Sequence, residues 1–134
     1  MKLNTFKFCM ISFVCCATFS CKSTSSVHLP SAAETSILGS WEGCDGRVIT
    51  FRRGPGGEIL GRYSELGGLE RYRFTQDEVG YRIREKTPGT YEGKVKWQNT
   101  QGSETWKTVA ITIQNNEYSD NSSDPCSNYM TRIH

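Results

Sequence analysis

The stretch VGYRIREKTPGTYEGKVKWQ, residues 79–98, decides the fold. In each half, residues that suit a buried face alternate with charged or polar residues, which is the pattern of a β-strand with one buried and one solvated face. The turn-forming sequence Thr87-Pro88-Gly89-Thr90 separates the two halves. We therefore predict two antiparallel strands joined by a hairpin. Their inward-facing residues are Val79, Tyr81 and Ile83 in the first strand and Tyr91, Gly93, Val95 and Trp97 in the second.

Weaker alternation continues on both sides of this hairpin and predicts further strands at 47–53, 59–63, 69–75, 105–113 and 128–133, after a first strand that opens at Gly39. Segments rich in Gly, Pro and Asn separate these strands, and residues 115–125 are expected to form a polar loop. No helical periodicity of useful length interrupts them, so parallel crossover connections are not expected. The chain is therefore predicted to be an antiparallel meander.

A meander of this length exposes two edges unless it closes on itself. We expect an all-β fold with a single antiparallel up-and-down barrel of about seven or eight strands, formed by residues 39–134. The interior of a barrel of about eight strands is wide enough to be filled by side chains or to hold one small ligand.

The first twenty residues have the pattern of a secretion signal. Lys2 and Lys7 precede residues 8–19, a run without charge that is shorter than the roughly 20 residues needed to cross a bilayer. We therefore assign residues 1–20 to a signal peptide that is removed. Ser20-Cys21 resembles the lipobox of bacterial lipoproteins, which implies lipid modification of Cys21 and attachment to a membrane of the cell envelope. Ordinary secretion with an unmodified Cys21 is the alternative.

Residues 21–38 follow as a Ser- and Thr-rich, flexible tether. A short helical turn within 30–38, beginning near Ser31, is expected to deliver Ile37 and Leu38 to the domain.

Composition and charge exclude two further classes of protein. With 36% hydrophobic and 11% aromatic residues the chain is too apolar to be disordered. Without the signal peptide, 14 basic residues face 14 acidic ones, and neither half of the chain carries a basic stripe. Because nucleic-acid binding depends on such a stripe, we expect no nucleic-acid partner.

Two cysteines remain once the signal peptide is removed and Cys21 is assigned to lipid. Cys44 and Cys126 are predicted to form a disulfide between the two ends of the domain. The alternative is a metal site, but zinc needs about four ligands, and His28 and His134 are the only histidines. We therefore expect neither a metal nor another cofactor.

The sequence Gly39-Ser40-Trp41 resembles the Gly-x-Trp signature of lipocalins and the wider calycin superfamily. The resemblance implies a ligand-binding barrel in which Arg132, on the last strand, packs across Trp41. A guanidinium over an indole ring is a favourable cation–π contact. Avidin-like barrels are also similar, through Trp97-Gln98-Asn99 and Glu104-Thr105-Trp106.

A second resemblance belongs to another class of function. Trp41-Glu42-Gly43-Cys44 is similar to the start of lipoprotein inhibitors of C-type lysozyme, which are small barrels with one disulfide. It implies a protein-binding module in the cell envelope.

No set of residues suggests catalysis, because neither histidine lies inside the predicted barrel and Glu92, Glu104 and Glu117 fall on solvated faces or turns. We therefore do not expect an enzyme. Four arginines recur at a spacing of two, and either form an outward basic ladder or pair with nearby glutamates: Arg71, Arg73, Arg82 and Arg84.

The inward-facing aromatic residues Tyr81, Tyr91 and Trp97 either fill the core or line a small apolar pocket. Our interpretation is a lipocalin-like envelope lipoprotein that binds a small apolar molecule with these three residues. A protein-binding module such as a lysozyme inhibitor is the alternative.

Overall fold

A computed structural model describes residue 29 and residues 31–134. The predicted signal peptide at 1–20, the predicted lipid-modified Cys21 and the tether up to residue 28 lie outside the described residues. Within the described part of the chain, no helix is long and apolar enough to cross a membrane.

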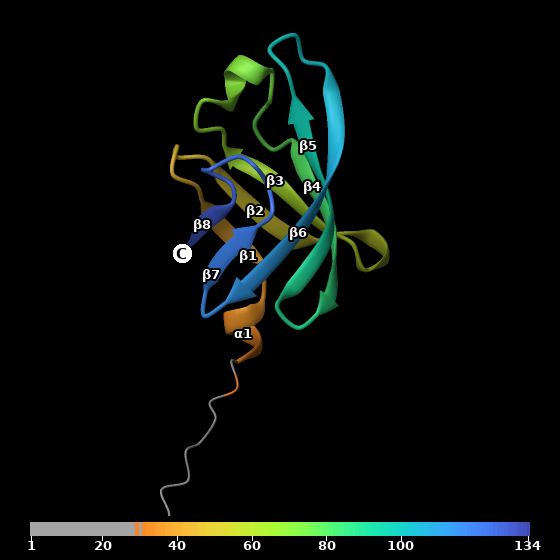
Figure 1. Ribbon diagram of the computed structural model, residues 1–134, viewed down its shortest axis with the longest axis vertical. Helices are drawn as coiled ribbons and strands as arrows, with labels where there is room; N and C mark the ends of the chain where they lie inside the picture. Colours follow the sequence, from red (N-terminus) through yellow and green to blue (C-terminus); the bar gives the residue numbers. More distant parts are fainter. Residues whose placement is uncertain (1–28, 30) are drawn as a thin grey trace, which may run out of the picture.

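Eight antiparallel strands form a closed barrel, which confirms the predicted all-β up-and-down architecture (Figure 1). Each strand pairs with the next in sequence, and the first pairs with the last. The strands are β1 (Gly39–Glu42), β2 (Val48–Arg53), β3 (Ile59–Glu65), β4 (Val79–Thr87), β5 (Thr90–Gln98), β6 (Glu104–Gln114), β7 (Glu117–Asp120) and β8 (Tyr129–Ile133). The short helix α1 (Ala32–Thr35) precedes them, and the 3-10 turns η1 (Pro55–Gly57) and η2 (Leu69–Tyr72) lie in two of the connections.

The helix α1 covers one end of the barrel (Figure 1). Ser31 and Glu34 form a reciprocal capping box at its start, so the predicted helical turn is confirmed. Just after the helix, Ile37 is completely buried in the core. Its backbone amide donates a hydrogen bond to the Tyr91 hydroxyl (3.1 Å), and its carbonyl accepts one from the Trp41 indole (2.8 Å). Residues 34–38 therefore pack as part of the folded unit.

Aromatic and β-branched side chains fill much of the interior of the barrel. The Phe51 ring packs edge-on against Tyr81 with 5.4 Å between the ring centroids, and Trp41 lies 5.8 Å from Tyr118. The residues around them that are almost inaccessible to solvent are Ile49, Ile83, Val109, Ile111 and Ile113. They come from β2, β4 and β6, so the two-residue alternation of the sequence places one face of every long strand inside.

The first and last strands are joined in two ways. In the β1–β8 pairing Trp41 lies opposite Arg132, whose guanidinium carbon is 4.3 Å from the centroid of the Trp41 ring. Arg132 also donates hydrogen bonds to the backbone carbonyls of Ser36 and Leu38. The predicted disulfide between Cys44 and Cys126 is confirmed and links the segments beyond β1 and before β8.

Two local predictions were wrong, although the number of strands was right. Residues 69–75 do not form a strand, because Gly68 and Arg73 adopt left-handed backbone conformations on either side of the 3-10 turn η2. The residues expected to form a loop contain β7, which pairs with both β6 and β8. Asn115 and Asn116 both have positive φ and make the tight turn that leads into β7.

Candidate functional site

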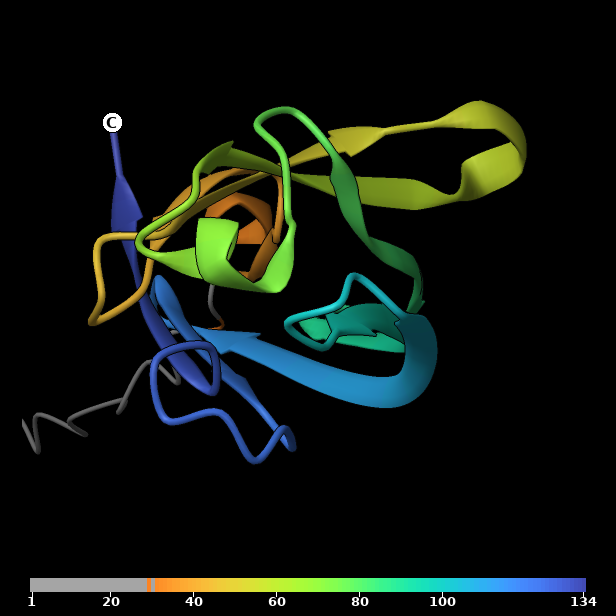
Figure 2. The ribbon, with the colours of Figure 1, turned by 90° about the horizontal axis from the view of Figure 1, so that it is seen from above.

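A cavity of about 540 Å³ lies at the end of the barrel opposite α1. Four segments supply most of its lining, namely 45–47, 67–74, 95–98 and 122–127. Seen from above, the segment that contains η2 lies across the opening of the strand ring (Figure 2). The cavity is therefore built from loops on the rim of the barrel together with the end of β5, and the strands hold these loops in fixed positions.

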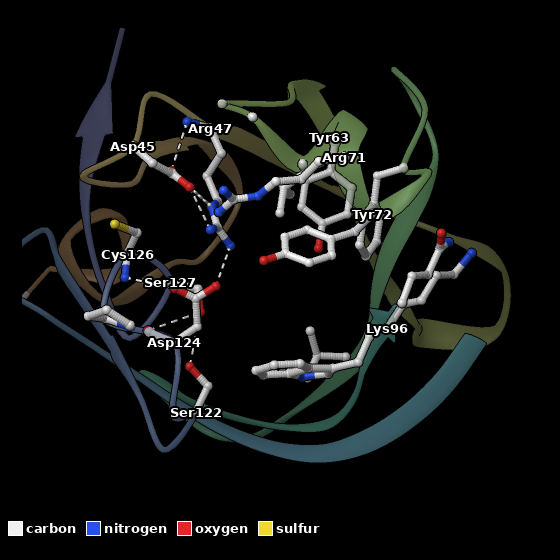
Figure 3. Close-up of a pocket in the computed structure, with 18 of the residues that line it drawn as sticks. Asp45, Arg47, Tyr63, Arg71, Tyr72, Lys96, Ser122, Asp124, Cys126 and Ser127 are labelled. Carbon is white, nitrogen blue, oxygen red and sulfur yellow. Dashed lines mark hydrogen bonds and ion pairs between the residues drawn. The ribbon is translucent and has the colours of Figure 1, made fainter. Parts of the chain in front are cut away.

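A buried arginine forms one side of this cavity (Figure 3). Arg47 is 7% exposed and its guanidinium group lies between two carboxylates. Its Nε and Nη2 atoms donate to Asp45, at 2.6 to 3.0 Å, and its Nη1 atom donates to Asp124 at 2.8 Å. Asp124 also accepts a hydrogen bond from the backbone amide of Cys126 (2.9 Å). The ion cluster is thereby fixed to the disulfide.

Asp45 and Arg47 both favour their charged states in this cluster. Burial alone would raise the pKa of Asp45, but hydrogen bonds from Arg47 outweigh burial and leave the pKa of Asp45 below its usual value. Burial alone would lower the pKa of Arg47, but Asp45 and Asp124 raise it above its usual value. A buried arginine that is paired in this way holds its position, because each broken contact would leave a buried charge without a partner.

The turn η2 is held close above this cluster by Gly67. A Cβ atom on Gly67 would lie 2.3 Å from the backbone nitrogen of Arg47, and its φ of +57° lies in the left-handed region. Only glycine combines that conformation with so close an approach. The roof of the cavity therefore packs directly on the backbone of its buried cation.

Aromatic side chains form much of the remaining wall. Tyr63 is 3% exposed and meets Phe74 edge-on, with 5.1 Å between the ring centroids. Burial raises the pKa of Tyr63, so its phenol stays neutral. In the 3-10 turn, Leu69 and Tyr72 are three residues apart and both line the cavity. Figure 3 shows Tyr72 extending into the opening, beside Tyr63.

The three residues predicted to bind the ligand, Tyr81, Tyr91 and Trp97, do not all line the cavity. Tyr81 and Trp97 line the cavity. Tyr91 does not, because its hydroxyl group accepts a hydrogen bond from the Ile37 amide and donates one to the Thr35 carbonyl (3.0 Å), at the end closed by α1. Alternation placed Tyr91 correctly inside the barrel, but it does not say at which end of the barrel a residue lies.

Several cavity residues were missed by the sequence analysis, among them Asp45, Arg47 and Asp124. Their positions next to the two cysteines could have indicated them. Asp45 and Arg47 follow Cys44 closely, and Asp124 precedes Cys126 by two positions. A disulfide between these cysteines brings the flanking charges within reach of one another. The spacing alone did not show that the arginine would be buried.

The four arginines considered as a ladder do not share one surface. Arg71 and Arg73 belong to the η2 segment and not to a strand. Arg82 pairs with Glu58 at 3.4 Å, and Arg84 donates to the carbonyl of Gly56. Of the two alternatives for these arginines, the outward basic ladder is therefore not found, because residues 69–75 turn over the barrel mouth.

No family model, curated protein or solved structure matches the chain. Within the described residues, no three metal-ligating side chains of His, Cys, Asp or Glu come together. The site is therefore interpreted from its own geometry. It offers an apolar, aromatic volume next to fixed hydrogen-bond donors, which is the arrangement found in pockets for small organic molecules.

Proposed function

We propose that this protein binds a small, mostly apolar molecule in the cavity at the open end of its barrel. One observation carries the proposal: a cavity of about 540 Å³, within the range of roughly 300 to 1,000 Å³ that is typical of small-molecule pockets, lies among aromatic and aliphatic side chains at the barrel mouth. Its apolar wall includes Leu69, Phe74, Val95 and Trp97. The resemblance of Gly39-Ser40-Trp41 to the lipocalin signature supports the same function.

The cavity is also held ready for a ligand. The Arg47 cluster fixes the loops at 45–47 and 122–127 relative to each other, and the disulfide joins the same two segments. Gly67 places the η2 segment on top of them. Because these loops are already ordered by internal contacts, a ligand would lose little affinity in ordering them.

We further propose that binding takes place at the cell envelope, with the barrel anchored through a lipid on Cys21. The support is the sequence of residues 1–21, in which a charged start, an uncharged run and Ser20-Cys21 follow in the order of a lipoprotein signal. Incorporation of radiolabelled palmitate into the full chain, but not into a Cys21→Ala variant, tests this part.

The test of binding is a titration of the protein with the lipophilic probe N-phenyl-1-naphthylamine while tryptophan fluorescence is recorded. We expect quenching of Trp97, which lines the cavity, and little change in Trp106, which lies on the outer side near Lys96 and Arg82. A Trp97→Phe variant should lose most of the quenching, and a Trp106→Phe variant should retain it.

A blocked cavity provides the matched control. Leu69→Trp places a larger side chain inside the cavity, whereas Leu60→Trp adds the same side chain on the outer groove of β3. Probe binding should be lost in the first variant only. Equal binding by both variants would contradict the proposal, and affinity for C-type lysozyme that survives Leu69→Trp would favour the protein-binding alternative.

A further inference from the structure

Two cations at the mouth of the barrel lie over aromatic rings of the cavity wall. The guanidinium carbon of Arg71 is 4.9 Å from the centroid of the Tyr72 ring, and the Nζ atom of Lys107 is 3.9 Å from that of Trp97. Both rings belong to residues that line the cavity. Cation–π contacts of this kind hold a cation in place without neutralising its charge.

Neither cation is paired with a carboxylate among the described residues, and the carboxylates of the cavity are already engaged. Asp45 accepts from the side chain of Arg47 through both of its oxygens, and Asp124 accepts from Arg47 and from the Cys126 amide. Of the cations that line the cavity, Arg47 is paired with both of these carboxylates, whereas Arg71 has no paired carboxylate among the described residues.

Lys96 also borders the cavity, but unlike Arg71 it is already paired. Its Nζ atom lies 2.7 Å from Glu78 and 3.2 Å from Glu104. Burial alone would lower the pKa of Lys96, but these two carboxylates raise it above its usual value. The charge of Lys96 is therefore satisfied within its own ion cluster.

Arg71 provides free hydrogen-bond donors at the mouth of the cavity. Arg71 lines the cavity, is exposed, and makes no hydrogen bond with another described residue. Figure 3 shows its side chain reaching over the opening toward Arg47. The fork of guanidinium N–H groups matches the two oxygens of a carboxylate better than it matches any neutral acceptor.

We infer that the ligand is an amphipathic monocarboxylate, whose carboxylate binds Arg71 at the mouth while its apolar body enters among Leu69, Phe74 and Val95. This inference rests on the proposed function, because it assigns the polar end of a ligand held in that cavity. A single carboxylate would pair with Arg71, which lines the cavity and has no carboxylate partner among the described residues. An apolar body accounts for the aromatic and aliphatic wall, which a small hydrophilic anion would leave unused.

The test compares two ligands of the same shape by isothermal titration calorimetry at pH 7. Naphthalene-2-carboxylate carries the charge, and naphthalene-2-carboxamide is its neutral counterpart. We expect the carboxylate to bind about tenfold more tightly, since a hydrogen bond to a charged group is worth more than a neutral one. Arg71→Gln should reduce this preference to less than about twofold.

Arg52→Gln is the matched control, because it removes the same charge from the outer groove of β2 and β3. This variant should keep the full preference for the carboxylate. If both ligands bind equally to the wild type, the carboxylate inference is overturned and the proposed function stands. If neither binds, the proposed function fails together with the inference.

Two further results would also overturn the assignment. A preference that survives Arg71→Gln would show that another group recognises the anion. Tighter binding of the dianionic 2-naphthyl phosphate than of the carboxylate would show that the mouth accommodates more than one negative charge.

Discussion

Gly67 lies against the backbone of Arg47, so closely that a Cβ atom on the glycine would come within 2.3 Å of the arginine nitrogen. Through this contact the turn that roofs the cavity rests on the loop that carries the buried cation. The roof and the ion cluster therefore form one rigid unit, and a change at Gly67 should disturb both.

The adjacent glycine provides a control for this contact. Gly67 and Gly68 both have positive φ, of +57° and +90°, but a Cβ atom on Gly68 would meet nothing within 4 Å. Alanine at either position pays a conformational cost of roughly 1 to 2 kcal/mol. We expect Gly67→Ala to lower the free energy of unfolding by about 2 kcal/mol more than Gly68→Ala, because its methyl group must also displace the Arg47 loop. Urea unfolding of the two variants measures the difference, and equal losses would contradict it.

Arg132 should contribute strongly to the closure of the barrel. Arg132→Met removes the contact with Trp41 and leaves the carbonyls of Ser36 and Leu38 without their donor. We expect the free energy of unfolding to fall by about 3 kcal/mol. Arg52→Met, on the exposed outer face, is the control and should change it by less than about 0.5 kcal/mol. Similar losses in both variants would show that Arg132 does not hold the seam between β1 and β8.

Tyr91 should affect stability without affecting the cavity. In Tyr91→Phe the Ile37 amide loses its acceptor and the Thr35 carbonyl loses its donor, so we expect a loss of roughly 1 to 3 kcal/mol in the free energy of unfolding. Affinity for N-phenyl-1-naphthylamine should stay within about twofold of the wild type. A large loss of affinity in Tyr91→Phe would place the ligand at the other end of the barrel.

The Asp45–Arg47 pair should make the protein sensitive to acid. The pKa of Asp45 is lowered in the folded state, so the unfolded chain binds the proton more readily. The contribution of Asp45 to stability is complete above the unfolded pKa of about 4 and is lost as the pH falls through the lower folded value. Asp45→Asn should therefore be less stable than the wild type at pH 7 and should lose less stability between pH 5 and pH 2. Parallel stability curves for the two proteins would contradict this role.

The disulfide closes a loop across 82 residues of sequence, which is most of the domain. The loop-entropy relation gives a stabilisation of roughly 4 to 5 kcal/mol for a loop of this length. The Cys44→Ala/Cys126→Ala variant should lose about that amount in the free energy of unfolding. Addition of a reductant to the wild type should produce the same loss, and an unchanged urea midpoint under reducing conditions would contradict it.

Much of the barrel could be predicted from alternation because each long strand has one buried face. The strands around Tyr81 and Val95 are long enough for a period of two to be unmistakable. The strand β7 has four residues and only Tyr118 buried, so its period cannot be recognised without the neighbours β6 and β8. The segment from Leu69 to Phe74 alternates as well, but Gly68 and Arg73 fix a turn that alternation does not detect.

The site was less predictable than the fold. The inward direction of Tyr81, Tyr91 and Trp97 follows from parity, but their distribution between the two ends of the barrel depends on strand tilt and on the docking of α1. The position of Arg47 depends on Asp124, which is 77 residues away in sequence. Such a pairing becomes visible only when the disulfide and the strand order have brought the loops together.

The pairing of β1 with β8 also affects the order of events in folding of the barrel. Leu38 and Arg132, whose backbone and side chain meet there, are 94 residues apart in sequence. During synthesis, the residues of β1 and β2 emerge before those of β8, which pairs with the other edge of β1. Until β8 is made, the open edge of β1 can pair with a strand of another molecule. Final ring closure is thus a late and slow event in folding, and the newly made chain needs protection from aggregation until β8 arrives.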